Sequence, residues 1–102
     1  MPESIYINEV HIRGKVSNVK VLNAAGVARF VVSTEYYFGG AGGRVVDITY
    51  FHVESLTDRP VPKDGQVAEV WGRTRAQRYT NSEGEECTYS YIIAKDIKVY
   101  DV

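Results

Sequence analysis

The chain has a single cysteine among its 102 residues, so it cannot form an internal disulfide, and a cysteine-rich zinc site is excluded. No stretch approaches the ~18 apolar residues of a membrane-spanning helix. The N-terminus lacks the basic start and apolar run of a signal peptide. A large charge of one sign is also missing, because the formal net charge is −1. These absences predict a cytoplasmic protein without membrane association, and they argue against a polybasic binder of double-stranded DNA.

A helical apolar pattern with a 3.6-residue period is missing too, and no repeat or low-complexity tail is present. What recurs is the two-residue alternation of β-strands. Residues 1–4 are expected to form a loose leader. The predicted strands are Ile5–Leu22, Val27–Tyr37, Val45–Leu56, Gln66–Tyr79, and a fifth made of Cys87–Ala94 followed by Ile97–Tyr100.

The first of these strands is long and contains an isolated glycine, Gly14, which indicates a bulge or a sharp bend. Closure of a small barrel requires such a curved strand. The connector Thr57–Gly65 contains prolines and leaves no room for a useful helix. We therefore predict an all-β fold, an open five-stranded barrel of the oligonucleotide-binding type, as a single domain over residues 1–102. Its edges must be covered, and pairing with another copy is one way to cover them.

A glycine-rich segment, Gly39–Gly43, invites comparison with phosphate-binding loops. No Lys-Ser/Thr pair and no helix pattern follow it, and its spacing is not that of a dinucleotide fingerprint. We interpret it as the flexible tip of a hairpin. Tyr36, Tyr37 and Phe38 stand on one side of this tip, and Arg44 stands on the other.

The most informative stretch runs from Trp71 to Tyr91 and reads WGRTRAQRYTNSEGEECTYSY. It predicts a hairpin whose turn, Thr80–Glu86, also holds a group of acidic residues. One face of its first strand carries Arg73, Arg75, Gln77 and Tyr79, because side chains alternate along a strand. Guanidinium groups that pair with phosphates, beside a ring that stacks on bases, suit a groove for single-stranded nucleic acid. An ordinary solvated strand face is the alternative.

Acid–base catalysis finds little support. The two histidines, His11 and His52, are not paired with a nucleophile or with a set of metal ligands. We therefore predict no enzyme activity, no catalytic residues, no metal and no cofactor. Trp71 is expected either on the arginine side of its strand or at a contact between subunits.

Several segments, in this order and spacing, resemble the bacterial single-stranded DNA-binding protein family and its smaller relative, primosomal replication protein N. The matching segments are Asn8–Gly14, Gly26–Thr34, Asp47–Val53, Lys63–Arg73 and Arg78–Gly84, and together the resemblance spans Asn8 to Asp101. Three departures are visible. The family's helix between strands three and four is missing or minimal, the acidic C-terminal tip is absent, and tyrosine or phenylalanine replaces the stacking tryptophans.

The resemblance implies which residues bind a single strand. Tyr79 matches one stacking position, Tyr50 matches a second (Phe51 in a register one residue later), and Phe38 or Tyr37 matches a third. Leu56 falls where the family often has phenylalanine, so we expect no stacking there. The full predicted nucleic-acid-binding set is Lys20, Tyr37, Phe38, Arg44, Tyr50, His52, Trp71, Arg73, Arg75, Arg78 and Tyr79.

The resemblance also implies a function: binding of single-stranded DNA with little sequence preference, in replication, recombination and repair, by a homodimer or homotetramer. The sequence does not separate DNA from RNA. An alternative stays open, in which the barrel is a protein-interaction module of a replication-restart (primosome) complex and contacts other replication proteins. The eight tyrosines suit either role, because tyrosine is enriched in protein interfaces as well.

Overall fold

The computed structural model describes residues 6–40 and 43–101. The expected leader, residues 1–4, lies outside this range, as do residues 41–42 of the expected hairpin tip. The strands are β1 (Val10–Leu22), β2 (Val27–Gly40), β3 (Gly43–Leu56), β4 (Val67–Thr80) and β5 (Glu86–Tyr100). A short 3-10 turn, Asn23–Ala25, joins β1 to β2. The predicted all-β fold is confirmed.

The strands form a closed barrel in the order β1-β2-β3-β5-β4. The expectation of an open barrel is therefore wrong: a short parallel contact, Val53 with Ile92 and Glu54 with Ile93, joins β3 to β5 and completes the circle. Every other neighbouring pair is antiparallel. Closure pairs the main-chain groups of the barrel strands, so the barrel itself does not need a second copy to cover an edge.

The long first strand pairs with two neighbours in turn, with β4 over Val10–Lys15 and with β2 over Lys15–Leu22. Gly14 lies at this change of partner, and a Cβ added there would stand 2.1 Å from the main-chain oxygen of Ser33. Only glycine fits such a close approach of two strands. The irregularity in register lies further along, between Ser17 and Lys20.

The core is made of small and branched side chains that alternate inward along all five strands. Val32, Val53 and Val70 are fully buried, and Phe51 packs against the cluster from its edge. The buried cluster consists of Val16, Phe30, Val32, Val53, Ala68, Val70, Ile92, Ala94 and Ile97.

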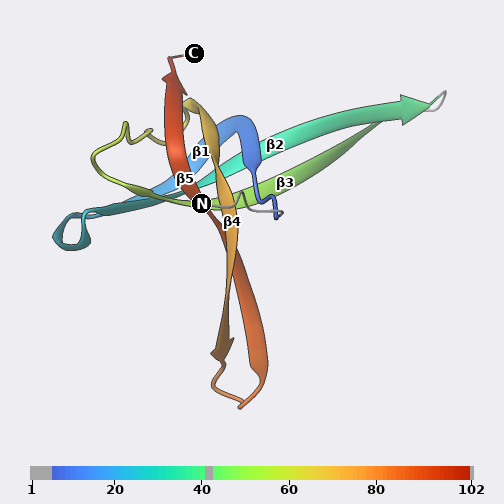
Figure 1. The fold of residues 1–102 in the computed structure, drawn as a ribbon. Coiled ribbons are helices and arrows are strands. Elements are labelled where there is room, and N and C mark those ends of the chain that lie inside the picture. Colours follow the sequence, from blue (N-terminus) through green and yellow to red (C-terminus); the bar gives the residue numbers. More distant parts are fainter. Residues whose placement is uncertain (1–5, 41–42, 102) are drawn as a thin grey trace.

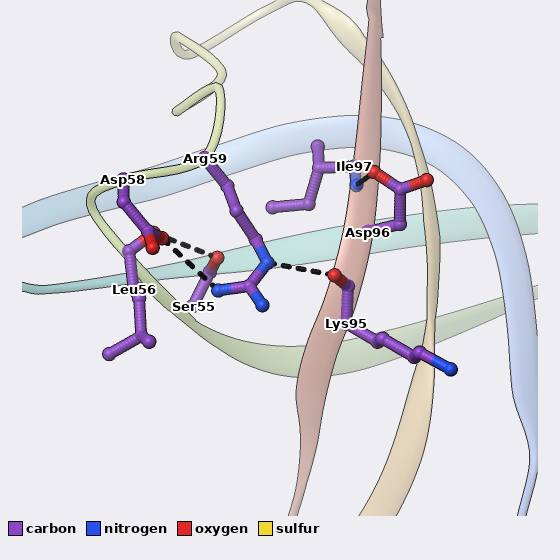
Figure 2. A network of polar contacts seen from close by, with 7 residues as sticks. All are labelled: Ser55, Leu56, Asp58, Arg59, Lys95, Asp96 and Ile97. Carbon is purple, nitrogen blue, oxygen red and sulfur yellow. Dashed lines mark hydrogen bonds and ion pairs between the residues drawn. The ribbon is translucent and has the colours of Figure 1, made fainter.

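The connector between β3 and β4 is held by polar contacts instead of a helix, and no helix occurs among its described residues. Arg59 reaches across to β5, where its Nε donates to the main-chain oxygen of Lys95 at 2.7 Å, while its Nη1 contacts Asp58 at 3.2 Å (Figure 2). Pro62 is fully buried. The predicted loss of the helix is confirmed.

Two hairpins continue past the barrel as long two-stranded ribbons that leave it in different directions (Figure 1). The β2–β3 arm comprises residues 34–40 and 43–49, where β2 and β3 pair only with each other. The β4–β5 arm comprises residues 75–80 and 86–91, which likewise pair only with each other. An isolated two-stranded ribbon is marginally stable in water, so both arms are suited to become ordered against a ligand.

Candidate nucleic-acid interface

The outer surface of β2 and β3 carries two of the predicted residues, Tyr50 and His52, along one line. Antiparallel partners share a face, and the register pairs Val31 with His52 and Ser33 with Tyr50. The core residues Phe30 and Val32 point the other way. Tyr50 is 65% exposed, so its ring is open to solvent.

The β4–β5 arm presents a second line of side chains. Its register pairs Arg75 with Tyr91 and Gln77 with Tyr89, so these four side chains share a face. Their side chains face the outer surface of β2 and β3, because β5 adjoins β3 at the barrel. The predicted face of arginine and glutamine is therefore completed by two tyrosines from the neighbouring strand.

Between these two lines lies a groove of about 850 Å³, here called the arm groove. His52 and Tyr89 both line it, and their rings contact each other with centroids 5.7 Å apart and an interplanar angle of 51°. Tyr89 and Tyr91 continue the row with centroids 5.6 Å apart and an interplanar angle of 26°. The lining residues are Asn18, Lys20, Arg29, Phe30, Val31, His52, Val53, Glu54, Arg75, Gln77, Tyr89 and Tyr91.

The arm groove is locally basic although the chain as a whole is not. Lys20, Arg29 and Arg75 line it, against a single carboxylate, Glu54. Glu54 lies 3.9 Å from the Nε of Arg29, so it offsets part of that charge. Aromatic faces beside cations are what a single strand requires, because bases stack on rings and phosphates pair with the cations.

The structure brings several of the predicted residues together. Lys20, His52 and Arg75 line the arm groove. Arg78 and Tyr79 line an adjoining hollow of about 650 Å³ further along the β4–β5 arm. Tyr79 and Tyr50, on which the prediction of a base-stacking track depended, are both exposed and neither lies in the core.

Tyr37 and Phe38 fall on opposite faces of the β2–β3 arm. The register places Tyr37 on the face of Tyr50 and His52, whereas Phe38 lies on the reverse face, where its ring packs 5.7 Å from that of Tyr36. The hydroxyl of Tyr37 donates to the Glu35 carboxylate, and this hydrogen bond raises the pKa of Tyr37 above its usual value. Arg44 belongs to β3, and its side chain lies outside the described part of the structure.

Trp71 and Arg73 precede Arg75 on the same face of β4, but neither lines the arm groove. Trp71 instead stacks on His11 of β1, with ring centroids 4.9 Å apart and an interplanar angle of 14°. The stacked pair belongs to the outer surface of β1, β4 and β5, here called the Trp71 face. Trp71 therefore lies on the arginine side of its strand, the first of the two places expected for it, but outside the arm groove.

The Trp71 face is organised by Glu69, whose side chain is only 14% exposed. The hydroxyl of Tyr100 donates to Glu69 at 2.6 Å, and the His11 ring bonds the other carboxylate oxygen. The two hydrogen bonds lower the pKa of Glu69 below its ordinary value of 4.5, and the charge of Arg13 adds to this effect.

The lowered pKa of Glu69 predicts how stability depends on pH. Because the folded state releases this proton more readily than the unfolded state, its stabilising effect is complete above pH 4.5 and is lost as the pH falls further. We expect Glu69→Gln to lower the melting temperature at pH 7 and to approach the wild type at pH 3. Thermal unfolding followed by circular dichroism checks this, and an equal difference at both pH values would contradict it.

Among the cations and rings that line the arm groove, sequence reasoning missed Arg29, Tyr89 and Tyr91. A signal for the two tyrosines was available, because a hairpin closed by Thr80 and Glu86 pairs Gln77 with Tyr89 and Arg75 with Tyr91. Arg29 depends on the closure of the barrel, which brings β2 near the β4–β5 arm. No comparable sequence signal exists for it.

Neither a metal site nor a membrane span emerges from the residues that the structure describes. Within them, no group of three or more His, Cys, Asp or Glu residues is placed to hold a metal ion. No helix in the same residues is both long enough and apolar enough to cross a bilayer.

The sequence matches no protein-family model and no curated protein. Solved structures with the same fold are found. An SSB of Plasmodium falciparum in complex with ssDNA superposes with a TM-score of 0.76 at 17% identity, covering 99% of this chain and 100% of that one. A small single-stranded DNA-binding protein of Streptomyces coelicolor gives 0.61 at 16% identity, over 88% of this chain and 91% of that one.

A deletion mutant of the single-stranded DNA binding protein of Thermus aquaticus gives a TM-score of 0.68 at 16% identity. That match covers 93% of this chain and 51% of the Thermus chain. At these identities, the similarity establishes that this chain has the barrel fold found in single-stranded DNA-binding proteins.

Proposed function

We propose that this protein binds single-stranded DNA, with little sequence preference, and that it is a binding protein and not an enzyme. The observation that carries the proposal is the arm groove, where the rings of His52, Tyr89 and Tyr91 stand beside Lys20, Arg29 and Arg75. The fold shared with single-stranded DNA-binding proteins supports it. A role in replication, recombination or repair, in the cytoplasm, is part of the same proposal.

In this mechanism the strand enters along the face of Tyr37 and Tyr50 and passes through the arm groove toward Tyr79. Each base stacked on a ring contributes about 1–3 kcal/mol, largely independent of sequence. Each phosphate neutralised by a cation releases counterions, which contributes about −0.7 to the slope of log K against log salt. Three groove cations therefore predict a slope of about −2.

Titration of a fluorescent oligo-dT at two salt concentrations tests the proposal. Binding at low salt that weakens with the predicted slope supports it, and absence of binding at low salt ends it. Competition with an oligo-U of equal length then decides between DNA and RNA.

Arg75→Ala and Tyr79→Ala are expected to weaken oligo-dT binding by different routes. Arg75→Ala removes a phosphate partner, so the salt slope should become less negative by about 0.7. Tyr79→Ala removes a stacking ring, so affinity should fall with the slope unchanged. Titrations of both variants across salt check this. Arg13→Ala, on the Trp71 face, is the charge-matched control and should bind like the wild type. Equal slopes for Arg75→Ala and wild type would contradict the assignment of Arg75.

Self-association is proposed as well, as a homodimer or homotetramer formed through the Trp71 face. His11 of the stacked pair is 58% exposed and Trp71 is half-buried, and aromatic residues are enriched in the cores of protein interfaces. Light scattering on the wild type and on Trp71→Ala checks this. A wild-type mass of one chain would contradict it.

Contact with other replication proteins is the rival function, favoured by the exposed pair Tyr36–Phe38 on the reverse face of the β2–β3 arm. A pulldown with and without nuclease separates the two. Partners that are lost after nuclease treatment are held by nucleic acid, and partners that stay are held by the protein.

A further inference from the structure

Asn8 joins the segment before β1 to the base of the β4–β5 arm. Its side-chain Nδ2 donates to the main-chain oxygen of Thr74 at 2.7 Å, and its Oδ1 accepts from the main-chain nitrogen of Thr74 at 3.0 Å. The Thr74 hydroxyl also donates to Oδ1 at 3.0 Å. We infer that Asn8 is a positioning residue, which sets the angle at which the β4–β5 arm leaves the barrel and thereby the width of the arm groove.

The register explains why the side chain takes this place. β1 and β4 pair antiparallel, and the last pair is Val10 with Gly72. Two residues further in the same register, Asn8 would lie opposite Thr74. Asn8 is not part of β1, which begins at Val10, and its amide supplies the donor and the acceptor that a paired strand residue would supply from its main chain. The Asn8 side chain therefore adds one more hydrogen-bonded pair to the β1–β4 ladder, at Thr74, directly before the β4–β5 arm begins.

The base of the arm is otherwise a natural place to bend. The β4–β5 register shifts between Trp71 and Gly72, which is the local irregularity of a β-bulge. Gly72 approaches β5 so closely that an added Cβ would stand 2.0 Å from the main-chain oxygen of Ile93. Here β5 is still held by β3, at Ile92 and Ile93, whereas β4 has lost its pairing with β1. A contact that holds β4 at Thr74 therefore affects the direction in which the hairpin leaves the barrel.

Because the arm extends away from the barrel, a small rotation of the arm at Thr74 changes the width of the arm groove. Gln77 lies three residues beyond Thr74, which is about 10 Å along a strand. A rotation of about 10° at Thr74 would move Gln77 by about 2 Å relative to the barrel. The side chains facing it across the arm groove belong to β1, β2 and β3, and they would not move with the arm. An arm that samples such rotations must be ordered on binding, and this ordering weakens affinity.

Distances between two spin labels test the positioning role without any ligand. With Cys87→Ser as background, labels at Ser82→Cys, in the turn of the arm, and Lys63→Cys, in the connector, report the arm angle. We expect a broader distance distribution in Asn8→Ala. In Asn8→Gln, which keeps the amide on a longer chain, we expect a shifted mean. Asn23→Ala, the same change in the exposed turn after β1, should match the wild type. Unchanged means and widths in both Asn8 variants would overturn the inference.

The consequence for binding rests on the proposed function. Asn8→Ala is expected to weaken oligo-dT binding by about tenfold, or about 1.4 kcal/mol, with Asn23→Ala unchanged. An unaltered affinity in an Asn8→Ala protein whose arm has loosened would refute the link to the groove. If the wild type bound no oligo-dT, the proposed function would fail, and the spin-label distances would still decide whether Asn8 positions the arm.

Discussion

Replacing Tyr50 and Tyr89 together with alanine is expected to weaken the binding of oligo-dT by at least about thirtyfold. The two rings belong to the two lines of side chains that frame the arm groove, Tyr50 on the β3 side and Tyr89 on the β4–β5 arm. Each stacked base contributes about 1–3 kcal/mol, so losing two stacks removes about 2–6 kcal/mol. Titration of a fluorescent oligo-dT at low salt measures the loss.

Tyr36→Ala is the matched control for this experiment. Tyr36 is as exposed as Tyr50, at 67% against 65%, and it lies on the same β2–β3 hairpin, but the register places it on the reverse face. We expect Tyr36→Ala to bind within about twofold of the wild type. If Tyr36→Ala and the single variant Tyr50→Ala lost similar oligo-dT affinity, rings on both faces of the hairpin would contribute equally. That result would contradict the proposed path of the strand along the Tyr50 face.

Gly14→Ala is expected to destabilise the fold by about 3 kcal/mol or more, and to lower the melting temperature by more than about 12 °C. An alanine Cβ would stand 2.1 Å from the main-chain oxygen of Ser33, which belongs to the β1–β2 ladder and cannot move aside like a flexible side chain. Relief requires β1 and β2 to separate at the point where β1 changes partner. Thermal unfolding by circular dichroism measures the effect.

Gly65→Ala separates this steric effect from the ordinary cost of replacing a glycine. Gly65 has a φ of 90°, and an added Cβ there meets no atom within 4 Å. Its replacement should therefore cost only the backbone strain, about 1–2 kcal/mol. A Gly14→Ala protein no less stable than Gly65→Ala would mean that β1 and β2 do not approach as closely as the structure places them.

Much of the barrel could be predicted because strand alternation is a local property. The alternation that puts Arg73 and Arg75 on one face of their strand puts Ala68 and Val70 on the other, and both are buried. The two runs expected to make the fifth strand, Cys87–Ala94 and Ile97–Tyr100, form one strand, Glu86–Tyr100, with a register shift at Lys95 between them. A bulge interrupts the apolar pattern much as a loop does, so the two cannot be told apart from the sequence.

Closure and the groove could not be predicted, because both depend on contacts between distant strands. The parallel contact of β3 with β5 involves two residue pairs, too few to leave a pattern. That contact brings His52 beside Tyr89 and Arg29 toward Arg75. The chemistry of the site was therefore recognised in part, in Lys20, His52 and Arg75, while its partners Arg29 on β2 and Tyr89 and Tyr91 on β5 were missed.

Amide chemical shifts during titration with a short oligo-dT test the central claim most directly. If the strand lies in the arm groove, the amides of His52, Gln77, Tyr89 and Tyr91 should shift together and saturate with one dissociation constant, while those of Trp71 and its neighbours stay in place. Shifts confined to the Trp71 face, or no shift at all at low salt, would contradict the proposal that this groove receives a single strand.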